Sequence, residues 1–135
     1  MRTIFTLALF AFILLFNCKR NNSEKATPKK PRTTLEVKKE WWDNGTIASE
    51  GEYKNGKANG KMKWYHQNGY IAGEGPMKND LRHGWWIVYN VEDGSISAEG
   101  NFDNDIKHGT WKLYNADGTL KETQLWEYNK LISKD

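Results

Sequence analysis

Several residue types that would indicate a specific chemistry or a compact core are scarce in this chain of 135 residues. The one cysteine, Cys18, cannot form an internal disulfide, and three histidines beside it give no Cys/His ligand cluster of the kind that holds structural zinc. There is no glycine-rich phosphate loop and no nucleophile elbow. Val, Leu and Ile are sparse, which excludes an ordinary aliphatic core. The sequence therefore predicts no catalytic site, no metal and no cofactor.

What the chain has instead is glycine and aromatic rings: 12 Gly, 7 Trp, 6 Tyr and 5 Phe. Rings packed over glycine favour thin β structure. The formal charge of +3 is unevenly distributed. From Cys18 to Lys39 eight Lys and Arg stand against two acids, whereas from Glu40 to Asp135 eleven stand against fifteen, a net charge of −4. The pI near 8.9 is therefore no argument for nucleic-acid binding, and we expect none.

The N-terminus resembles a bacterial lipoprotein signal. An apolar run of thirteen residues from Ile4 to Phe16 follows Arg2. It is too short for a membrane-spanning helix, which needs about 20 residues, and suits the apolar region of a secretion signal. Leu15 lies three residues before Cys18, as in the lipobox. The resemblance implies that residues 1–17 are a signal peptide and that Cys18 is lipidated; an uncleaved signal anchor and an ordinary signal peptide are the alternatives.

Residues 18–33 are polar and basic and contain two prolines, Pro28 and Pro31. We interpret them as a flexible tether, whose charges could also lie along anionic headgroups. Lys19 follows the cysteine, where in enterobacterial sorting an Asp would retain a lipoprotein in the inner membrane. By that resemblance we expect a lipid-anchored protein of the bacterial cell envelope, with the outer membrane favoured.

Residues 34–135 are built on a repeat. Turn glycines recur at spacings of 24, 25 and 24 residues, and a second glycine series keeps step with them until Gln124 interrupts it. The first series is Gly45, Gly69, Gly94 and Gly118, and the second is Gly51, Gly75 and Gly100. A fixed period of this length is the signature of a repeat array.

Each copy is predicted to form two strands. Asn-Gly or Asp-Gly at the first glycine series predicts a short hairpin turn, and the polar segments after Asn55, Asn79 and Asn104 predict a longer hairpin to the next copy. The expected fold is all-β, a single-layer antiparallel meander of about four 24-residue repeats and about seven or eight strands. Leu35 and Val37 place the start of the first repeat before Trp41.

Glycine inside a strand normally weakens it, so the recurrence of Gly51, Gly75 and Gly100 needs a physical cause. We expect an aromatic ring of the neighbouring strand to lie across each missing side chain. On that basis Gly100→Val should disrupt packing more than Asp105→Val.

The pattern G-x-W-x-x-Y, then D/N-G, then E-G-x-Y/F-x-N resembles the MORN repeat, in the bacterial variant found in envelope proteins and in a family labelled antitoxin components of toxin-antitoxin systems. Residues 84–104 and 109–120 carry the pattern best, and it extends over about residues 40–128. The resemblance implies a scaffold sheet used for membrane association or protein contact.

Two polar columns are candidate sites. His83 and His108 occupy equivalent positions, but such positions in adjacent repeats lie about 10 Å apart, too far for one zinc ion, so a structural role beside a turn glycine is favoured. Glu50, Glu74 and Glu99 form a second column, whose spacing could suit glycoside hydrolysis. An open sheet has no enclosed pocket to raise a carboxyl pKa, so pairing with lysines across the strands is the favoured interpretation.

Four tryptophans form the candidate interaction surface: Trp85, Trp86, Trp64 and Trp111. Because Trp85, Trp86 and Ile87 are consecutive, at least one large apolar side chain must face each side of the sheet. An exposed apolar stripe usually marks an interaction surface. Trp85 has no aromatic counterpart in the neighbouring copies, where Lys61 and Thr110 occupy the equivalent positions.

The sequence thus favours a non-enzymatic, lipid-anchored envelope protein whose sheet is a scaffold for a protein partner. A glycan- or peptidoglycan-binding module that uses the aromatic face is the alternative, and an antitoxin component is a third hypothesis.

Overall fold

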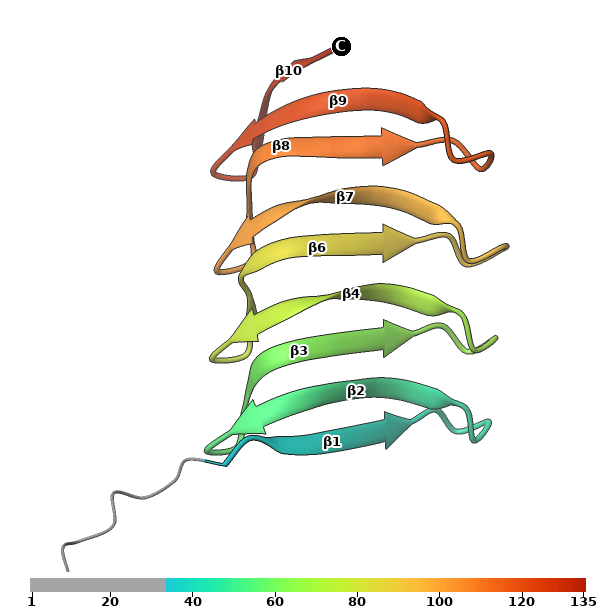
Figure 1. Ribbon diagram of the computed structural model, residues 1–135, viewed down its shortest axis with the longest axis vertical. Helices are drawn as coiled ribbons and strands as arrows, with labels where there is room; N and C mark the ends of the chain where they lie inside the picture. The colour runs from blue at the N-terminus through green and yellow to red at the C-terminus, as the bar shows by residue number, and fades with distance from the viewer. Residues whose placement is uncertain (1–33) are drawn as a thin grey trace, which may run out of the picture. The chain divides into compact units, whose positions relative to one another are not determined.

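The structure, a computed structural model, describes residues 34–135, which form one open antiparallel sheet (Figure 1). The strands are β1 Glu36–Trp41, β2 Ile47–Lys54, β3 Lys57–Tyr65, β4 Ile71–Lys78, β5 Leu81–Arg82, β6 Gly84–Tyr89, β7 Ile96–Asp103, β8 Ile106–Tyr114, β9 Leu120–Glu127 and β10 Lys130–Lys134. They follow one another across the sheet in chain order, with β5 off this path and paired to β4. No helix within the described range is long and apolar enough to span a membrane. Cys18, the predicted signal peptide and the tether lie outside the described residues.

The predicted all-β, single-layer meander is confirmed, and β1 begins before Trp41 as expected. The sheet has ten strands, however, instead of seven or eight. Part of the difference is β5, a two-residue piece that His83 separates from β6. The rest is at the C-terminal end, where β10 pairs with β9 after the last copy of the repeat.

The two kinds of hairpin connection have the opposite lengths from those predicted. The connections predicted to be longer, at Asn55–Gly56, Asn79–Asp80 and Asn104–Asp105, are two-residue turns, and Tyr128–Asn129 is a fourth that was not predicted. Both residues of each turn have positive φ, from 47° to 79°, which is the type I′ geometry that fits the twist of the flanking strands. Asn and Asp adopt positive φ more readily than other non-glycine residues, so Asn-Asp forms the second and third of these turns, whereas the first keeps the Asn-Gly pair.

The other connections are counted between the two residues whose backbone hydrogen bond closes the loop, such as Trp42 and Thr46. On that count the connections at Gly45, Gly69 and Gly118 hold three residues, and the one at Gly94 holds four. In each the Asn or Asp before the glycine accepts a hydrogen bond from the backbone N–H two residues later, as Asn44 does from Thr46 at 3.0 Å. This Asx turn leaves only the glycine with positive φ. The additional residue in the third loop accounts for the single 25-residue spacing.

The strands bend at another set of glycines, Gly60, Gly84 and Gly109, which belongs to neither series described above. Along β2 the partner of Gly51 is Met62 but the partner of Tyr53 is Ala58, so β3 has additional residues at Gly60. Gly84 and Gly109 mark the same place in later copies, and all three have positive φ. Additional residues in one strand bend and twist it, and the chain turns there toward the hairpins (Figure 1).

One face of the sheet, called the core face, carries the largest buried side chains. Trp86 and Trp111 are 2% and 1% exposed, and Trp64 stacks on Trp86 with ring centroids 4.6 Å apart. The ring of Phe102 meets Trp86 and Trp111 edge-on. The indole N–H groups of Trp86 and Trp111 donate to the backbone carbonyls of Pro76 and Asn101, at 2.9 and 3.1 Å, so the rings are buried with their polar atoms satisfied.

The predicted aromatic cover of the strand glycines is confirmed at Gly75 and Gly100 and is wrong at Gly51. A Cβ at Gly75 would lie 2.6 Å from atoms of Trp86, and one at Gly100 would overlap the ring of Trp111. At Gly51 the covering residue is Met62 and no aromatic ring. Gln124 replaces the glycine in the last copy, and its side chain instead accepts a hydrogen bond from the indole of Trp126 at 2.8 Å.

Each two-residue turn after the first is hydrogen-bonded to the strand that follows the preceding two-residue turn. Asp80 accepts a hydrogen bond from the Ala58 backbone N–H at 2.7 Å, Asp105 from Arg82 at 3.1 Å, and Asn129 from Lys107 at 2.6 Å. Asp105 also accepts from the Arg82 guanidinium at 2.6 Å. Asp105 is therefore not the neutral reference position that the Gly100→Val comparison assumed, because valine there would lose these bonds and meet a φ of 66°.

Candidate interaction surface

The face opposite the core face, called the ladder face, is organised by a row of paired side chains. Its members stand directly opposite one another on successive strands: Lys39, Glu50, Lys63, Glu74, Ile87, Glu99, Lys112 and Thr123. We call this row the charge ladder. Opposite charges on directly paired residues stabilise a sheet by a few tenths of a kcal/mol up to about 1 kcal/mol each, so the row first has a structural role.

The ladder is best formed around Glu74. The Lys63 ammonium lies 3.0 Å from its carboxylate, and the Tyr89 hydroxyl donates to it at 2.7 Å. The Tyr89 and Lys63 hydrogen bonds hold the pKa of Glu74 below its ordinary value. Burial, together with the hydrogen bond to Glu74, raises the pKa of Tyr89 to about 12. The next copy repeats the arrangement, since the Tyr114 hydroxyl donates to Glu99 at 2.5 Å.

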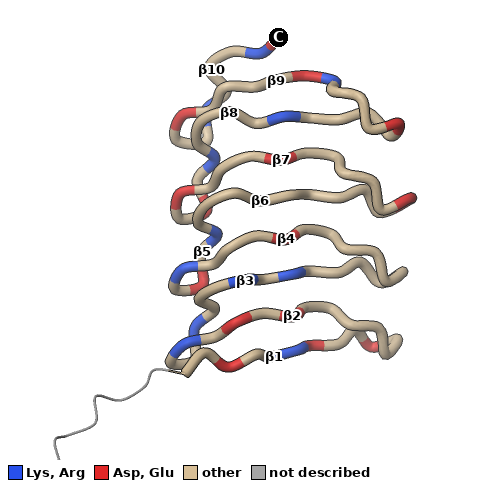
Figure 2. The backbone as a smooth tube through the Cα atoms, in the orientation of Figure 1, with Lys and Arg blue, Asp and Glu red and all other residues tan. Residues whose placement is uncertain are grey.

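The ladder is interrupted once, at Ile87. Lys63 and Lys112 hold the corresponding positions of β3 and β8, so Ile87 separates Glu74 from Glu99 without a cation. In Figure 2 β6 is tan along its whole length, whereas its neighbours carry charges. Two further apolar side chains accompany Ile87 on this face, namely Trp85 on the same strand and Pro76 on β4. We call Pro76, Trp85 and Ile87 the apolar patch.

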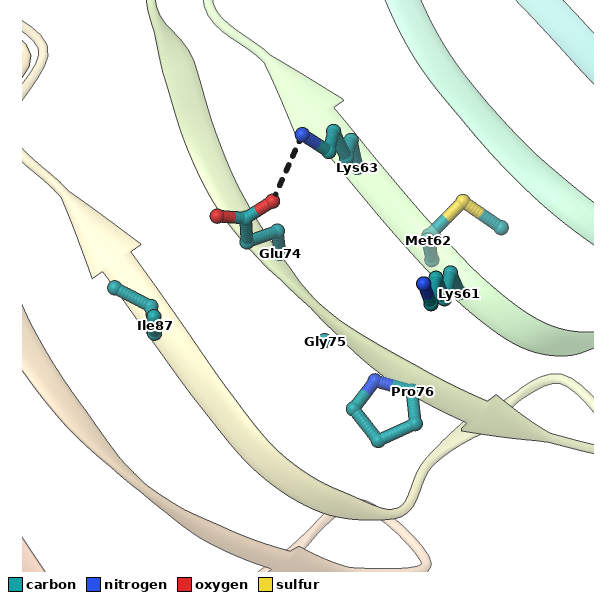
Figure 3. A pocket seen from close by; sticks show the side chains of 7 residues that line it. All are labelled: Lys61, Met62, Lys63, Glu74, Gly75, Pro76 and Ile87. Atoms are coloured by element: carbon teal, nitrogen blue, oxygen red, sulfur yellow. Dashed lines mark ion pairs between the residues drawn. The ribbon is translucent and has the colours of Figure 1, made fainter.

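The apolar patch borders a shallow hollow of about 510 Å³ over Gly75 (Figure 3). Pro76 and Ile87 line one side of it and Lys61 and Lys63 line the other, with the Lys63–Glu74 ion pair between them. Trp85 is 45% exposed. Within the described part of the chain Lys61 has no carboxylate within 4.0 Å, so the hollow combines apolar surface with an ammonium group that is free to pair.

The structure divides the four predicted tryptophans between the two faces. Trp85 is exposed on the ladder face, as the prediction requires. Trp86 and Trp111 are buried on the core face, so the prediction that these two belong to an exposed interaction surface is wrong. Trp64 is partly buried and packs against that core, on the face opposite Trp85. The reason is the bend of the strands, which lets one face of a single layer enclose its own rings.

The structure gives the positions of the two polar columns that the sequence singled out, the histidines and the glutamates. His83 lies 3.2 Å from Asp103, and the ring of His108 lies near that of Tyr128. No cluster of three or more potential metal ligands occurs among residues 34–135. Glu50, Glu74 and Glu99 lie on one face, but a member of the charge ladder stands between each pair of them. This arrangement uses the carboxylates as cross-strand partners.

The sequence prediction missed Pro76 and Ile87. Both are visible as departures from their columns, since Glu52 and Asn101 correspond to Pro76 and two lysines correspond to Ile87. These departures indicate an interaction surface only once it is known which columns share a face of the sheet. An isoleucine stands out at position 87 because the other members of its row are mostly charged.

Three segments of the chain match the family model described as MORN repeat variant: residues 37–55, 58–79 and 107–128. MORN-type repeats are thus present, and they are the unit of this sheet. The matched segments omit residues 80–106, although residues 84–104 were expected to carry the pattern best. That omitted part holds Trp85, Ile87 and the loop with the additional residue. No curated protein matches the chain.

Proposed function

We propose that this protein is a non-enzymatic, lipid-anchored scaffold of the bacterial cell envelope, and that the apolar patch on its ladder face is the point of contact with a protein partner. The single observation that carries the proposed contact site is the interruption of the charge ladder by Ile87 beside an exposed tryptophan. Repeat arrays built on similar units are consistent with a scaffold role rather than catalysis.

Charge pairing within the sheet does not explain the interruption. A lysine at position 87 would have Glu74 and Glu99 directly opposite, as Lys63 has Glu50 and Glu74. Trp85 leaves nearly half of a large ring in water. Exposed aromatic residues bordered by polar groups are enriched where proteins bind one another, so the patch is better explained by a partner than by folding.

The contact is tested by photo-crosslinking in cells. A benzophenone amino acid at Asn101, which is exposed and opposite Trp85, should yield a crosslinked protein. The double variant Trp85→Thr/Ile87→Lys introduces the residues that the next copy has, Thr110 and Lys112, and should abolish the crosslink while the melting temperature stays within a few degrees. The same crosslinker at Val91, in the third loop, is the control for non-specific capture.

A crosslink that survives the double variant would contradict the assignment of the patch. Retention of the protein on purified cell wall, lost in Trp85→Thr, would instead favour the glycan-binding alternative, because an exposed tryptophan can also stack on sugars.

The anchor is tested separately by Cys18→Ala. We expect the variant to leave the membrane fraction after a carbonate wash, because two or three acyl chains at about 0.8 kcal/mol per buried methylene would provide the attachment. The tether and the apolar run would then be insufficient to hold the protein. Persistence of the variant in the washed membranes would contradict lipidation and favour an uncleaved signal anchor.

A further inference from the structure

A second hollow lies at the N-terminal end of the sheet, between β1, β2, β3 and the first loops. Its volume is about 560 Å³, within the range of small-molecule sites. The aromatic residues that line it are Trp41, Trp42, Tyr53, Trp64 and Tyr65, and Glu40 adds a carboxylate. Trp41 and Trp42 are 62% and 39% exposed. This combination of rings and one negative charge differs from the apolar patch, which has two lysines beside it.

Elsewhere in the sheet the chain supplies its own cations to such rings. The Arg82 guanidinium lies 3.9 Å from the centroid of Phe102, and the Lys107 ammonium lies 4.3 Å from Trp111 and 4.5 Å from Trp126. At the N-terminal end Lys38 lies 5.0 Å from Tyr53. Within residues 34–135 no cation occupies the faces of Trp41, Trp42 or Trp64.

Glu40 gives the hollow its charge. It stands in the column that holds Trp64, Val88 and Leu113 in later copies, so a carboxylate replaces an apolar core side chain. The Ser49 hydroxyl donates to it at 3.1 Å, and no Lys, Arg or His of the described chain lies within 4.0 Å of it. Burial raises the pKa of Tyr53, and the charges of Glu40 and Asp80 raise it further.

The hollow is also held in shape before any ligand arrives. The Trp42 indole N–H donates to the Tyr65 backbone carbonyl at 3.1 Å, and Trp64 is fixed by its stacking on Trp86. Rings that are fixed before binding lower the entropy cost of binding.

We propose that this hollow binds a small organic ammonium ion, with the tryptophan faces and the Glu40 carboxylate surrounding its charge. A methylated ammonium fits best, because it is weakly hydrated and needs no hydrogen-bond acceptors, whereas a primary ammonium would lose strong hydration on entering an aromatic site. Aromatic cages recognise quaternary ammonium groups by this attraction. The proposal does not depend on the protein partner proposed above.

The test is a titration of the full chain, in dodecyl maltoside micelles, with choline and with its neutral isostere 3,3-dimethylbutan-1-ol. Tryptophan indole N–H resonances report the contact. We expect saturable shifts with choline and binding at least about 10-fold weaker with the isostere. Glycerophosphocholine, a phospholipid headgroup without chains, distinguishes the source: tighter binding than choline indicates a headgroup, and weaker binding indicates a free solute, both of which support ammonium recognition.

Variants locate the site. Trp42→Ala and Glu40→Gln should each weaken choline binding several-fold, whereas Trp85→Ala, which removes an exposed ring from the opposite face, should leave it unchanged. Glu40→Gln keeps the shape of the hollow and decides the matter if Trp42→Ala does not fold. Absence of choline binding, equal binding of the isostere, or wild-type affinity in Glu40→Gln would overturn the proposal.

Discussion

At the scale of single residues, the fold depends on three strand positions where a side chain is missing, Gly51 under Met62 and Gly75 and Gly100 under tryptophans. A Cβ at Gly75 or Gly100 would enter the ring. The turn glycines have a different role: Gly45, Gly69 and Gly118 have open space where a Cβ would be and are required only for their positive φ. The strand glycines are therefore required by sterics and the turn glycines by backbone conformation.

Gly100→Ala should lower the free energy of unfolding by about 1–3 kcal/mol, because the added methyl must displace Trp111 from a packed core. Thermal unfolding should show a fall of several degrees. The matched control is Asn101→Ala, at the exposed neighbouring position of the same strand. Equal melting temperatures for the two variants would mean that the ring does not depend on the glycine.

The Glu74 carboxylate should make stability depend on pH. Its pKa is lower in the folded state than the ordinary 4.5, so its contribution is present above that pH and is lost as the pH falls through the folded value. Tyr89→Phe removes the Tyr89 hydrogen bond, so the Glu74 pKa should rise and acid destabilisation should become shallower. Carboxyl NMR titration measures both, with Tyr114→Phe as the control that leaves Glu74 unchanged. A Glu74 pKa unaffected by Tyr89→Phe would contradict this account.

At the scale of elements, the two-residue turns hold neighbouring copies together through side-chain oxygens. Only the first turn has a glycine, Gly56, where the others have Asp80, Asp105 or Asn129. The Asp and Asn side chains at these positions each accept a hydrogen bond from the backbone of the preceding copy. The first turn of the described sheet follows no earlier turn, which explains why glycine is sufficient there.

Asp105→Gly should reduce stability by about 1–3 kcal/mol, because it leaves the Arg82 backbone N–H without its acceptor while it tolerates the φ of 66°. Asp105→Asn retains the acceptor and the conformation, so it should lose clearly less. Denaturant unfolding compares the two. The reverse change, Gly56→Asn, should give no stabilisation from this bond. An equal loss of stability in Asp105→Gly and Asp105→Asn would show that the charge of Asp105 matters and that its hydrogen bond to the Arg82 backbone does not.

Much of this element structure could be predicted from the sequence, and the two failures have separate causes. The period, the start of β1 and the aromatic cover of two of the three strand glycines follow from spacing alone. The turn lengths were assigned the wrong way round, because Asn-Gly suits both a type I′ turn and an Asx turn closed by glycine. The burial of Trp86 and Trp111 was missed because it depends on the bend at Gly60, Gly84 and Gly109, and alternation along a strand carries no information about curvature.

At the scale of the whole sheet, each copy touches only its neighbours. The charge ladder, the core-face rings and the hydrogen-bonded two-residue turns all run from one strand or copy to the next. Stability in such an array is approximately a sum over copies and their interfaces. Copies are then interchangeable wherever their columns agree, and what distinguishes one copy is available for function. The copy around β6 differs most, since it lacks the ladder cation and carries Trp85.

Deletion of residues 80–104 tests this directly. It removes one 25-residue period and joins Asn79 to Asp105, so a two-residue turn is kept, Trp111 takes the place of Trp86 over Gly75, and Lys112 comes opposite Glu74. We expect a shorter sheet that still melts cooperatively, at a temperature lower by several degrees, because one copy and one interface are lost.

The matched control is deletion of residues 85–108, which is one residue shorter and places Trp111 one position later after the bend. A shift of one residue turns side chains to the other face, so Trp111 would leave the core and cooperative melting should be lost. Circular dichroism and tryptophan fluorescence follow both variants. If the in-register deletion also fails to fold, the third copy is required for stability, and Trp85 and Ile87 would have to be explained by packing and not by a partner.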